Sequence, residues 1–120
     1  MQPITTNTYT TLQTLTEGLL FQSESDYPFE VKIVTDLAVL HLPNTTITLE
    51  ALLQRACTPK DWHTPAQQAT VARYQALYEY LQQFTNLSVY KTYDIVALIH
   101  IVLPTAPNEW VLVSTQAIET

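Results

Sequence analysis

The chain of 120 residues contains a single glycine, Gly18. Loops that cradle phosphate groups, and the fingerprints that bind dinucleotides, need several glycines because their backbone must approach the ligand closely. The sequence therefore excludes both kinds of nucleotide site. Gly18 stands between a helix-like pattern and a polar turn. Because glycine is typical just past the last residue of a helix, where the backbone turns left-handed, Gly18 predicts the end of the first helix.

The composition is that of one folded, acidic domain spanning residues 1–120. Apolar residues make up 47% of the chain and charged residues only 13%, a balance that favours a packed core over disorder. Eleven acidic against five basic residues give a formal net charge of −6. The chain lacks the clustered lysines and arginines that bind phosphate backbones. We therefore expect no direct binding to DNA or RNA, and a protein partner with a basic surface instead.

The sequence predicts a cytoplasmic protein that does not bind membranes. Its N-terminal segment has no positively charged stretch followed by an apolar one, so we expect no signal peptide. The longest apolar run, 95–103, is interrupted by His100 and is too short to cross a bilayer. The single cysteine, Cys57, excludes an internal disulfide, which also suits the cytosol.

Hydrophobic periodicity predicts three helices. The first covers 6–17, with Tyr9, Leu12 and Leu15 on one face and Leu19 continuing the spacing. A short helix is predicted over 49–56, ended by Pro59. A long helix then starts at the cap Thr64-Pro65-Ala66-Gln67 and extends to about Phe84. Its predicted apolar stripe consists of Val71, Tyr74, Tyr78 and Leu81, flanked by Leu77 and Phe84.

Alternating and continuous apolar runs predict the strands. These are 29–33, its hairpin partner 37–42, and three closing strands at 88–94, 95–103 and 109–115, the last two joined by a loop at 104–108. Residues 97–103 are almost continuously apolar, so we expect a central strand covered on both faces. The order of helices and strands predicts an α+β fold, with helices packed over a mostly antiparallel sheet.

The three histidines and the cysteine form no recognisable metal or catalytic motif. His41 and His100 lie in apolar segments, whereas His63 lies in a loop, and no pair has the spacing of zinc ligands. Cys57 lies at a helix end with no histidine close in sequence to activate it. We interpret the histidines as core or surface residues and the cysteine as structural.

Carboxylates gather in the turn after Gly18. Glu24 stands between two serines, and Asp26 and Glu30 follow. Such groups can serve as general acids or bases, but the simplest interpretation is a solvated polar loop in which a serine caps local backbone groups. Composition alone favours that interpretation over any function.

A tryptophan stands in the loop before the long helix. The segment 58–61 has a threonine cap, a proline and an acid, which predicts a single helical turn that presents Trp62 and His63. An exposed tryptophan there would be a typical anchor at a protein interface. A tryptophan that folds back over the sheet is equally consistent with the sequence, and both interpretations stay open.

Three long segments resemble the nuclease A inhibitor family, whose members block a sugar-non-specific nuclease. They are GLLFQSESDYPFEV at 18–31, RACTPKDWHTPAQQATVARYQAL at 55–77 and STQAIET at 114–120, in the order of the family. The resemblance covers nearly the whole chain. Two departures stand out: the segment around 36–48 is shorter than in the family, and position 60 is lysine where the family has a neutral polar residue.

The resemblance implies a three-layer α/β/α sandwich without a cofactor, and an inhibitor rather than an enzyme. Its implied partner is a ββα-metal endonuclease that cleaves DNA and RNA without sequence preference. The residues implied to contact that partner are Glu24 in the acidic turn, Lys60, Asp61 and Trp62 in the loop, and Thr120 at the C-terminus. Glu24 and Thr120 are expected near the partner's catalytic magnesium, where carboxylate oxygens can replace those of phosphate.

Two alternatives remain at this point. An enzyme or small-molecule binder of the same fold would need a concave pocket lined by Glu24, Asp26 and His63. A binding module for a different protein partner would keep the surface and change its specificity, through the shortened segment or Lys60. The inhibitor interpretation instead predicts an exposed Glu24 turn close to Trp62 and to the C-terminus.

Overall fold

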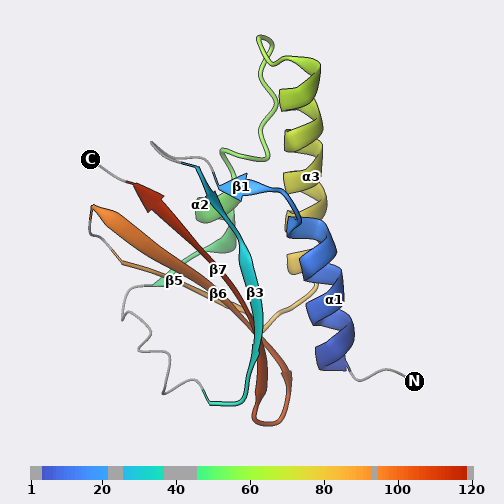
Figure 1. Cartoon of the computed structure of the whole chain (residues 1–120), viewed down its shortest axis with the longest axis vertical. Coiled ribbons are helices and arrows are strands. Elements are labelled where there is room, and N and C mark those ends of the chain that lie inside the picture. Colours follow the sequence, from blue (N-terminus) through green and yellow to red (C-terminus); the bar gives the residue numbers. More distant parts are fainter. Residues whose placement is uncertain (1–3, 22–25, 37–45, 93–94, 119–120) are drawn as a thin grey trace.

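The chain forms an α+β fold in which helices cover a five-stranded sheet (Figure 1). The computed structural model describes residues 4–21, 26–36, 46–92 and 95–118. The helices are α1 (Ile4–Thr16), α2 (Leu49–Leu53) and α3 (Pro65–Leu81). The strands are β1 (Leu20–Phe21), β2 (Tyr27–Pro28), β3 (Glu30–Val34), β4 (Thr46–Ile47), β5 (Ser88–Lys91), β6 (Val96–Ala106) and β7 (Glu109–Ile118).

The main sheet has the strand order β3-β7-β6-β5-β4, and all of its described pairs are antiparallel. Its longest ladder joins β6 to β7, from Val96 opposite Ile118 to Ala106 opposite Glu109. Asn108 takes φ 60° in the tight turn between them, a conformation that asparagine tolerates better than most residues. The strands β1 and β2 pair separately as a small hairpin. The predicted α+β class and antiparallel sheet are confirmed.

The three described helices pack over one face of this sheet. Leu12 of α1, Leu53 of α2 and Leu77 of α3 are each 0% exposed and belong to one apolar cluster with Ile101 and Val113 of the central strands. No described helix contributes to the opposite face. The third layer implied by the resemblance therefore remains a prediction.

The first helix ends as Gly18 predicts, but its buried face is unexpected. Gly18 has φ +70°, and the backbone N–H of Leu19 donates to the carbonyl of Thr16 at 2.9 Å. Tyr9 and Leu15 are only partly buried. The buried residues of α1 are Thr5, Thr8, Leu12 and Thr16. A threonine can be buried in a helix when its hydroxyl donates to a carbonyl one turn back, as the Thr16 hydroxyl does to Leu12 at 2.7 Å.

Two predicted helix boundaries differ in the structure. The helix predicted over 49–56 ends at Leu53, and the long helix ends at Leu81 rather than near Phe84. Residues 58–61 are not helical, but the His63 N–H donates to the Lys60 carbonyl, so a single hydrogen-bonded turn spans 60–63. The cap of α3, by contrast, is the predicted one: Gln67 N–H donates to the Thr64 hydroxyl, and the Gln67 side chain accepts from Thr64 N–H. Local cap chemistry was thus more predictable than helix length.

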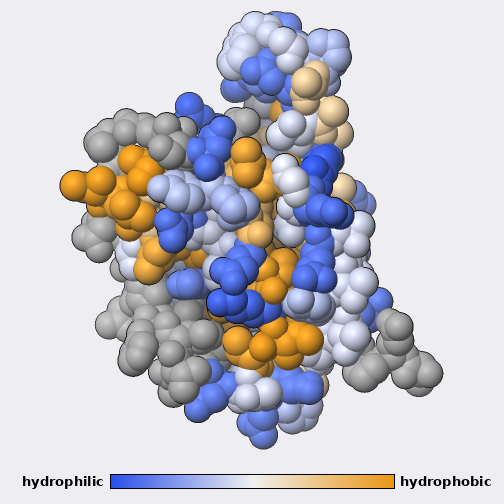
Figure 2. Space-filling model, in the orientation of Figure 1, coloured by the Kyte–Doolittle hydropathy of each residue, from blue (hydrophilic) through white to orange (hydrophobic). Residues whose placement is uncertain are grey.

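The described sheet differs from the predicted strands in two respects. The proposed hairpin partner of β3, at 37–42, lies outside the described residues, and the described partner of β3 is β7. β6 is central, as predicted, but both of its faces are buried only over 101–103. Towards its start, Val96 and Leu98 are 43% and 42% exposed. Apolar side chains gather on this part of the surface in Figure 2.

We predict that Gly18→Ala destabilises the fold by about 1–2 kcal/mol through backbone strain alone. A Cβ at this position meets nothing within 4 Å, so there is no clash to add. The free energy of unfolding from urea titration measures the effect. Gly18→Asn should cost less, because asparagine tolerates positive φ. Equal stabilities for glycine and alanine at position 18 would contradict this account.

The stability of the protein should also depend on His100. Its Nδ1 lies 2.8 Å from the Ser114 hydroxyl across the β6–β7 ladder, and burial lowers its pKa, with a further lowering by the positive charge of Lys32. The unfolded chain therefore takes up this proton at a higher pH than the folded chain does. The stability that neutral His100 contributes is fully present above the ordinary histidine pKa of about 6.5, and it is lost as the pH falls below that value.

We expect His100→Gln to weaken this loss of stability on acidification. The measurement is the free energy of unfolding of both proteins at a series of pH values from about 7.5 to 5. The chain's other histidines are present in both proteins, so the difference between the two profiles isolates His100. Parallel profiles would show that its protonation is not coupled to folding.

Candidate functional site

Trp62 projects from a turn that is closed by its neighbours. The backbone N–H of His63 donates to the Lys60 carbonyl at 3.1 Å, and the backbone N–H of Lys60 donates to His63 Nδ1 at 3.1 Å. The ring of Trp62 meets the ring of His63 edge-on, with centroids 4.6 Å apart. Trp62 is nevertheless 71% exposed. It does not fold back over the sheet, so the structure decides between the two interpretations of this residue.

The turn is attached to the start of α3. The capping box of Thr64 and Gln67 closes the helix immediately after it, and the Gln68 side chain donates to the His63 carbonyl at 3.3 Å. Lys60 and Asp61, the other two predicted loop contacts, are both exposed. All three predicted loop residues therefore lie on an accessible turn fixed to a long helix.

The structure describes the residues on both sides of the acidic turn. Glu24 lies outside the described residues, but Phe21 on one side pairs with Tyr27 on the other, and Leu20 pairs with Pro28. Asp26, immediately before β2, is exposed. The segment that contains Glu24 thus connects the two strands of a hairpin.

The C-terminal strand lies beside this hairpin. Thr120 is outside the described residues, and β7 is described to Ile118. The hydroxyl of Thr115, near the end of β7, donates to the carbonyl of Pro28 in β2 at 3.0 Å. In Figure 1, β1, the end of β7 and the segment leading into α3 all lie in the upper half of the molecule along its longest axis.

A second contact joins the hairpin to α3. The Tyr74 hydroxyl donates to the carbonyl of Leu20 in β1. Burial raises the pKa of Tyr74 well above its usual range, and the negative charge of Asp26 raises it further, so this hydroxyl keeps its proton as a donor. Tyr74 is 1% exposed, as its place on the predicted apolar stripe implies. Its link to the hairpin was not predicted, because the bond joins residues 54 positions apart and no local pattern specifies it.

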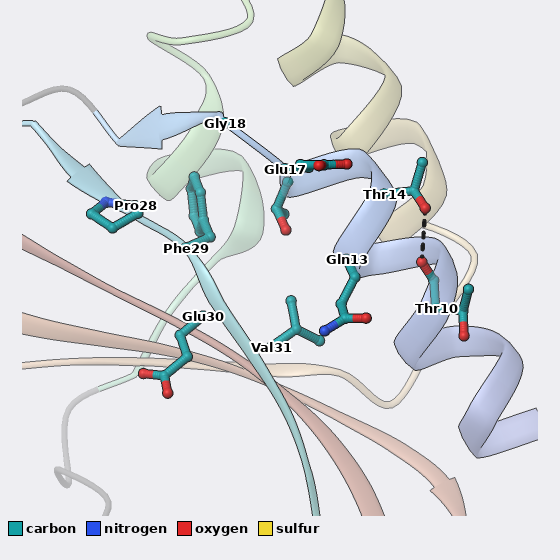
Figure 3. Close-up of a pocket in the computed structure, with 10 residues that line it drawn as sticks. Thr10, Gln13, Thr14, Glu17, Gly18, Pro28, Phe29, Glu30 and Val31 are labelled. Carbon is teal, nitrogen blue, oxygen red and sulfur yellow. Dashed lines mark hydrogen bonds between the residues drawn. The ribbon is translucent and has the colours of Figure 1, made fainter.

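A groove runs between α1 and the start of β3 (Figure 3). Its volume is about 550 Å³, and its lining residues are Thr10, Gln13, Thr14, Thr16, Glu17, Gly18, Pro28, Phe29, Glu30 and Val31. Asp26 and His63 do not line it, and Glu24 lies outside the described residues. It therefore does not match the pocket that the small-molecule alternative requires.

In the described part of the chain, the remaining reactive side chains are arranged neither as a metal site nor as an activated thiol. Within residues 4–21, 26–36, 46–92 and 95–118, no three His, Cys, Asp or Glu side chains cluster as a metal site would. Burial raises the pKa of the Cys57 thiol, which opposes formation of a nucleophilic thiolate. His41 lies outside the described residues.

None of the described helices combines the length and the apolarity needed to cross a bilayer.

Comparison with known proteins agrees with the resemblance of the three long segments. The model of the family described as nuclease A inhibitor-like proteins matches residues 6–120, from the first helix to the last residue. The chain matches no curated protein. Because the family match spans nearly the entire sequence, the chain belongs to the nuclease A inhibitor-like family.

Proposed function

We propose that this protein inhibits a sugar-non-specific, metal-dependent endonuclease by occluding its active site. Membership of an inhibitor family supports the activity and argues against catalysis by the chain itself. The observation that carries the mechanism is the contact between Thr115 of β7 and Pro28 of β2. It supports an arrangement in which the segments that contain Glu24 and Thr120 extend from neighbouring strands toward one partner.

The chemistry of the proposed contacts suits an active site that holds magnesium. Magnesium prefers oxygen ligands and keeps waters and substrate phosphate around it. The Glu24 carboxylate and the oxygens of Thr120 can stand in place of phosphate oxygens. A net charge of −6 complements the basic cleft of an enzyme that binds nucleic acid, and opposite charge accelerates the encounter of the two proteins.

The Trp62 turn supplies a different kind of contact. A large aromatic side chain that is already exposed can enter a pocket of the partner without unfolding its own loop. The reciprocal hydrogen bonds between Lys60 and His63 restrict that loop before binding, so little conformational entropy is left to lose. Asp61 would add a charged contact beside the aromatic anchor, and Lys60 a second one.

The mechanism predicts that Glu24→Ala combined with removal of Thr120 raises the inhibition constant at least about thirtyfold, because buried charged contacts are worth about 2–5 kcal/mol when truncated. The measurement is a titration of a ββα-metal endonuclease of the sugar-non-specific class, which wild type should inhibit at near-stoichiometric ratio.

Glu79→Ala provides the matched control, because it removes one exposed carboxylate from α3 and should leave inhibition unchanged. Full inhibition by the double variant would contradict the occlusion mechanism even if the activity is real. Failure of wild type against several such nucleases would instead favour a different protein partner.

Trp62→Ala should weaken inhibition about tenfold to thirtyfold, as truncation of an interfacial aromatic anchor typically costs about 1.4–2 kcal/mol or more. Its effect on the free energy of unfolding should be small, because the side chain is 71% exposed. Ile4→Ala removes another large exposed apolar side chain, 66% exposed at the start of α1, and should not change inhibition. Equal effects of the two substitutions would show that Trp62 is no specific anchor.

A further inference from the structure

Two backbone carbonyls at the base of the β1–β2 hairpin accept hydrogen bonds from side chains of distant elements. The carbonyl of Leu20 accepts from the Tyr74 hydroxyl of α3, and that of Pro28 accepts from the Thr115 hydroxyl of β7 at 3.0 Å. The two donors are 1% and 6% exposed. Each strand of the hairpin is thus tied to the body of the protein by one buried hydroxyl.

The hairpin needs these ties because its own pairing is weak. Each strand has only two residues, and isolated two-stranded hairpins are marginal in water. Pro28, opposite Leu20, has no N–H and cannot donate across the pair. Only the Phe21–Tyr27 position can therefore be the hydrogen-bonded one, and the Tyr74 hydroxyl adds a bond to the Leu20 carbonyl from outside the pair.

Aromatic packing reinforces the same attachment. Phe21, at the end of β1, meets Phe29 edge-on with ring centroids 6.1 Å apart. Phe29 in turn meets Tyr74 at 6.2 Å. Phe21 belongs to the hairpin and Phe29 directly follows it, so Tyr74 holds the hairpin through the ring of Phe29 as well as by its hydroxyl.

The two donors belong to the elements that carry the other proposed contacts. Tyr74 is on α3, whose cap follows the Trp62 turn, and Thr115 is on β7, which leads toward Thr120. We infer that Tyr74 and Thr115 are positioning residues. They fix the β1–β2 hairpin, whose connecting segment contains Glu24, relative to the Trp62 turn and the C-terminus before the nuclease binds. The inference rests on the proposed function and adds two residues that do not themselves touch the partner.

The expected gain comes from preorganisation. A loop that already holds its bound geometry loses less conformational entropy on association. Since one hydroxyl-to-carbonyl bond contributes a factor of about three to ten, we expect Tyr74→Phe and Thr115→Val each to weaken inhibition by about that factor. Phenylalanine keeps the ring contacts of Tyr74, and valine keeps the shape of threonine.

A double-mutant cycle with Glu24→Ala separates positioning from a general effect. If the hydroxyls act through the hairpin, Tyr74→Phe and Thr115→Val should change the inhibition constant by less than about twofold once Glu24 is alanine. Thr115→Ser, which keeps the hydroxyl, should restore wild-type inhibition. Tyr78→Phe and Thr70→Val, which remove hydroxyls elsewhere on α3, serve as controls and should leave inhibition unchanged.

Amide hydrogen exchange provides a readout that does not depend on any nuclease. Tyr74→Phe should accelerate exchange at Phe21 and Tyr27 by about threefold to tenfold, while exchange in the β6–β7 ladder stays as in wild type. Unchanged exchange at the hairpin, or effects on inhibition that simply add to that of Glu24→Ala, would overturn the positioning role. A wild-type chain that inhibits no nuclease of this class would overturn the proposed function itself, and with it any role of the two residues in binding.

Discussion

The β6–β7 ladder is the interaction on which the rest of the structure depends. It pairs ten- and eleven-residue strands from Val96–Ile118 to Ala106–Glu109, and it leaves one free edge for β5 and the other for β3. The side chains on its core face form the apolar surface against which the three described helices pack. The C-terminal part of β7 also carries Thr115, so the same ladder that builds the core fixes the hairpin beside the proposed binding surface.

The long helix α3 is the second fixed support, and it acts at its start and in its middle. At its start, the capping box holds the turn that exposes Trp62. In its middle, the Arg73 guanidinium donates to the carbonyls of Leu15 at 3.1 Å and Glu17 at 2.6 Å, close to the end of α1. Helix ends leave carbonyls without helical partners, so Arg73 satisfies groups that Gly18 alone cannot. Together with Tyr74, it determines where the chain enters the hairpin.

Local chemistry explains which features were predictable from the sequence. The helix end at Gly18 and the cap at Thr64 depend on a few adjacent residues, and both were predicted. The pairing of β3 with β7, and the bond from Tyr74 to Leu20, join residues more than fifty positions apart, and no local pattern specifies them. The exposure of Trp62 was undecidable for a different reason: it depends on hydrogen bonds between Lys60 and His63 that close the turn and that the residue types alone do not specify. Of the predicted site, the structure describes the loop residues directly, and Glu24 and Thr120 only through their neighbours.

The forces that hold the fold leave its acidic charge available for a partner. Tyr74, Thr115 and Arg73 secure the hairpin and its approach by donating to backbone carbonyls, which requires no carboxylate. The ion pair of Lys32 and Glu30 is more than half exposed at both side chains, 56% and 65%, and such pairs contribute little to stability. The helices attach mainly through apolar side chains. The buried Thr5 hydroxyl of α1 also donates to the Glu109 carboxylate at 3.2 Å. An excess of carboxylates is therefore compatible with a stable fold, and under the proposed function its consequence falls on recognition of a basic partner.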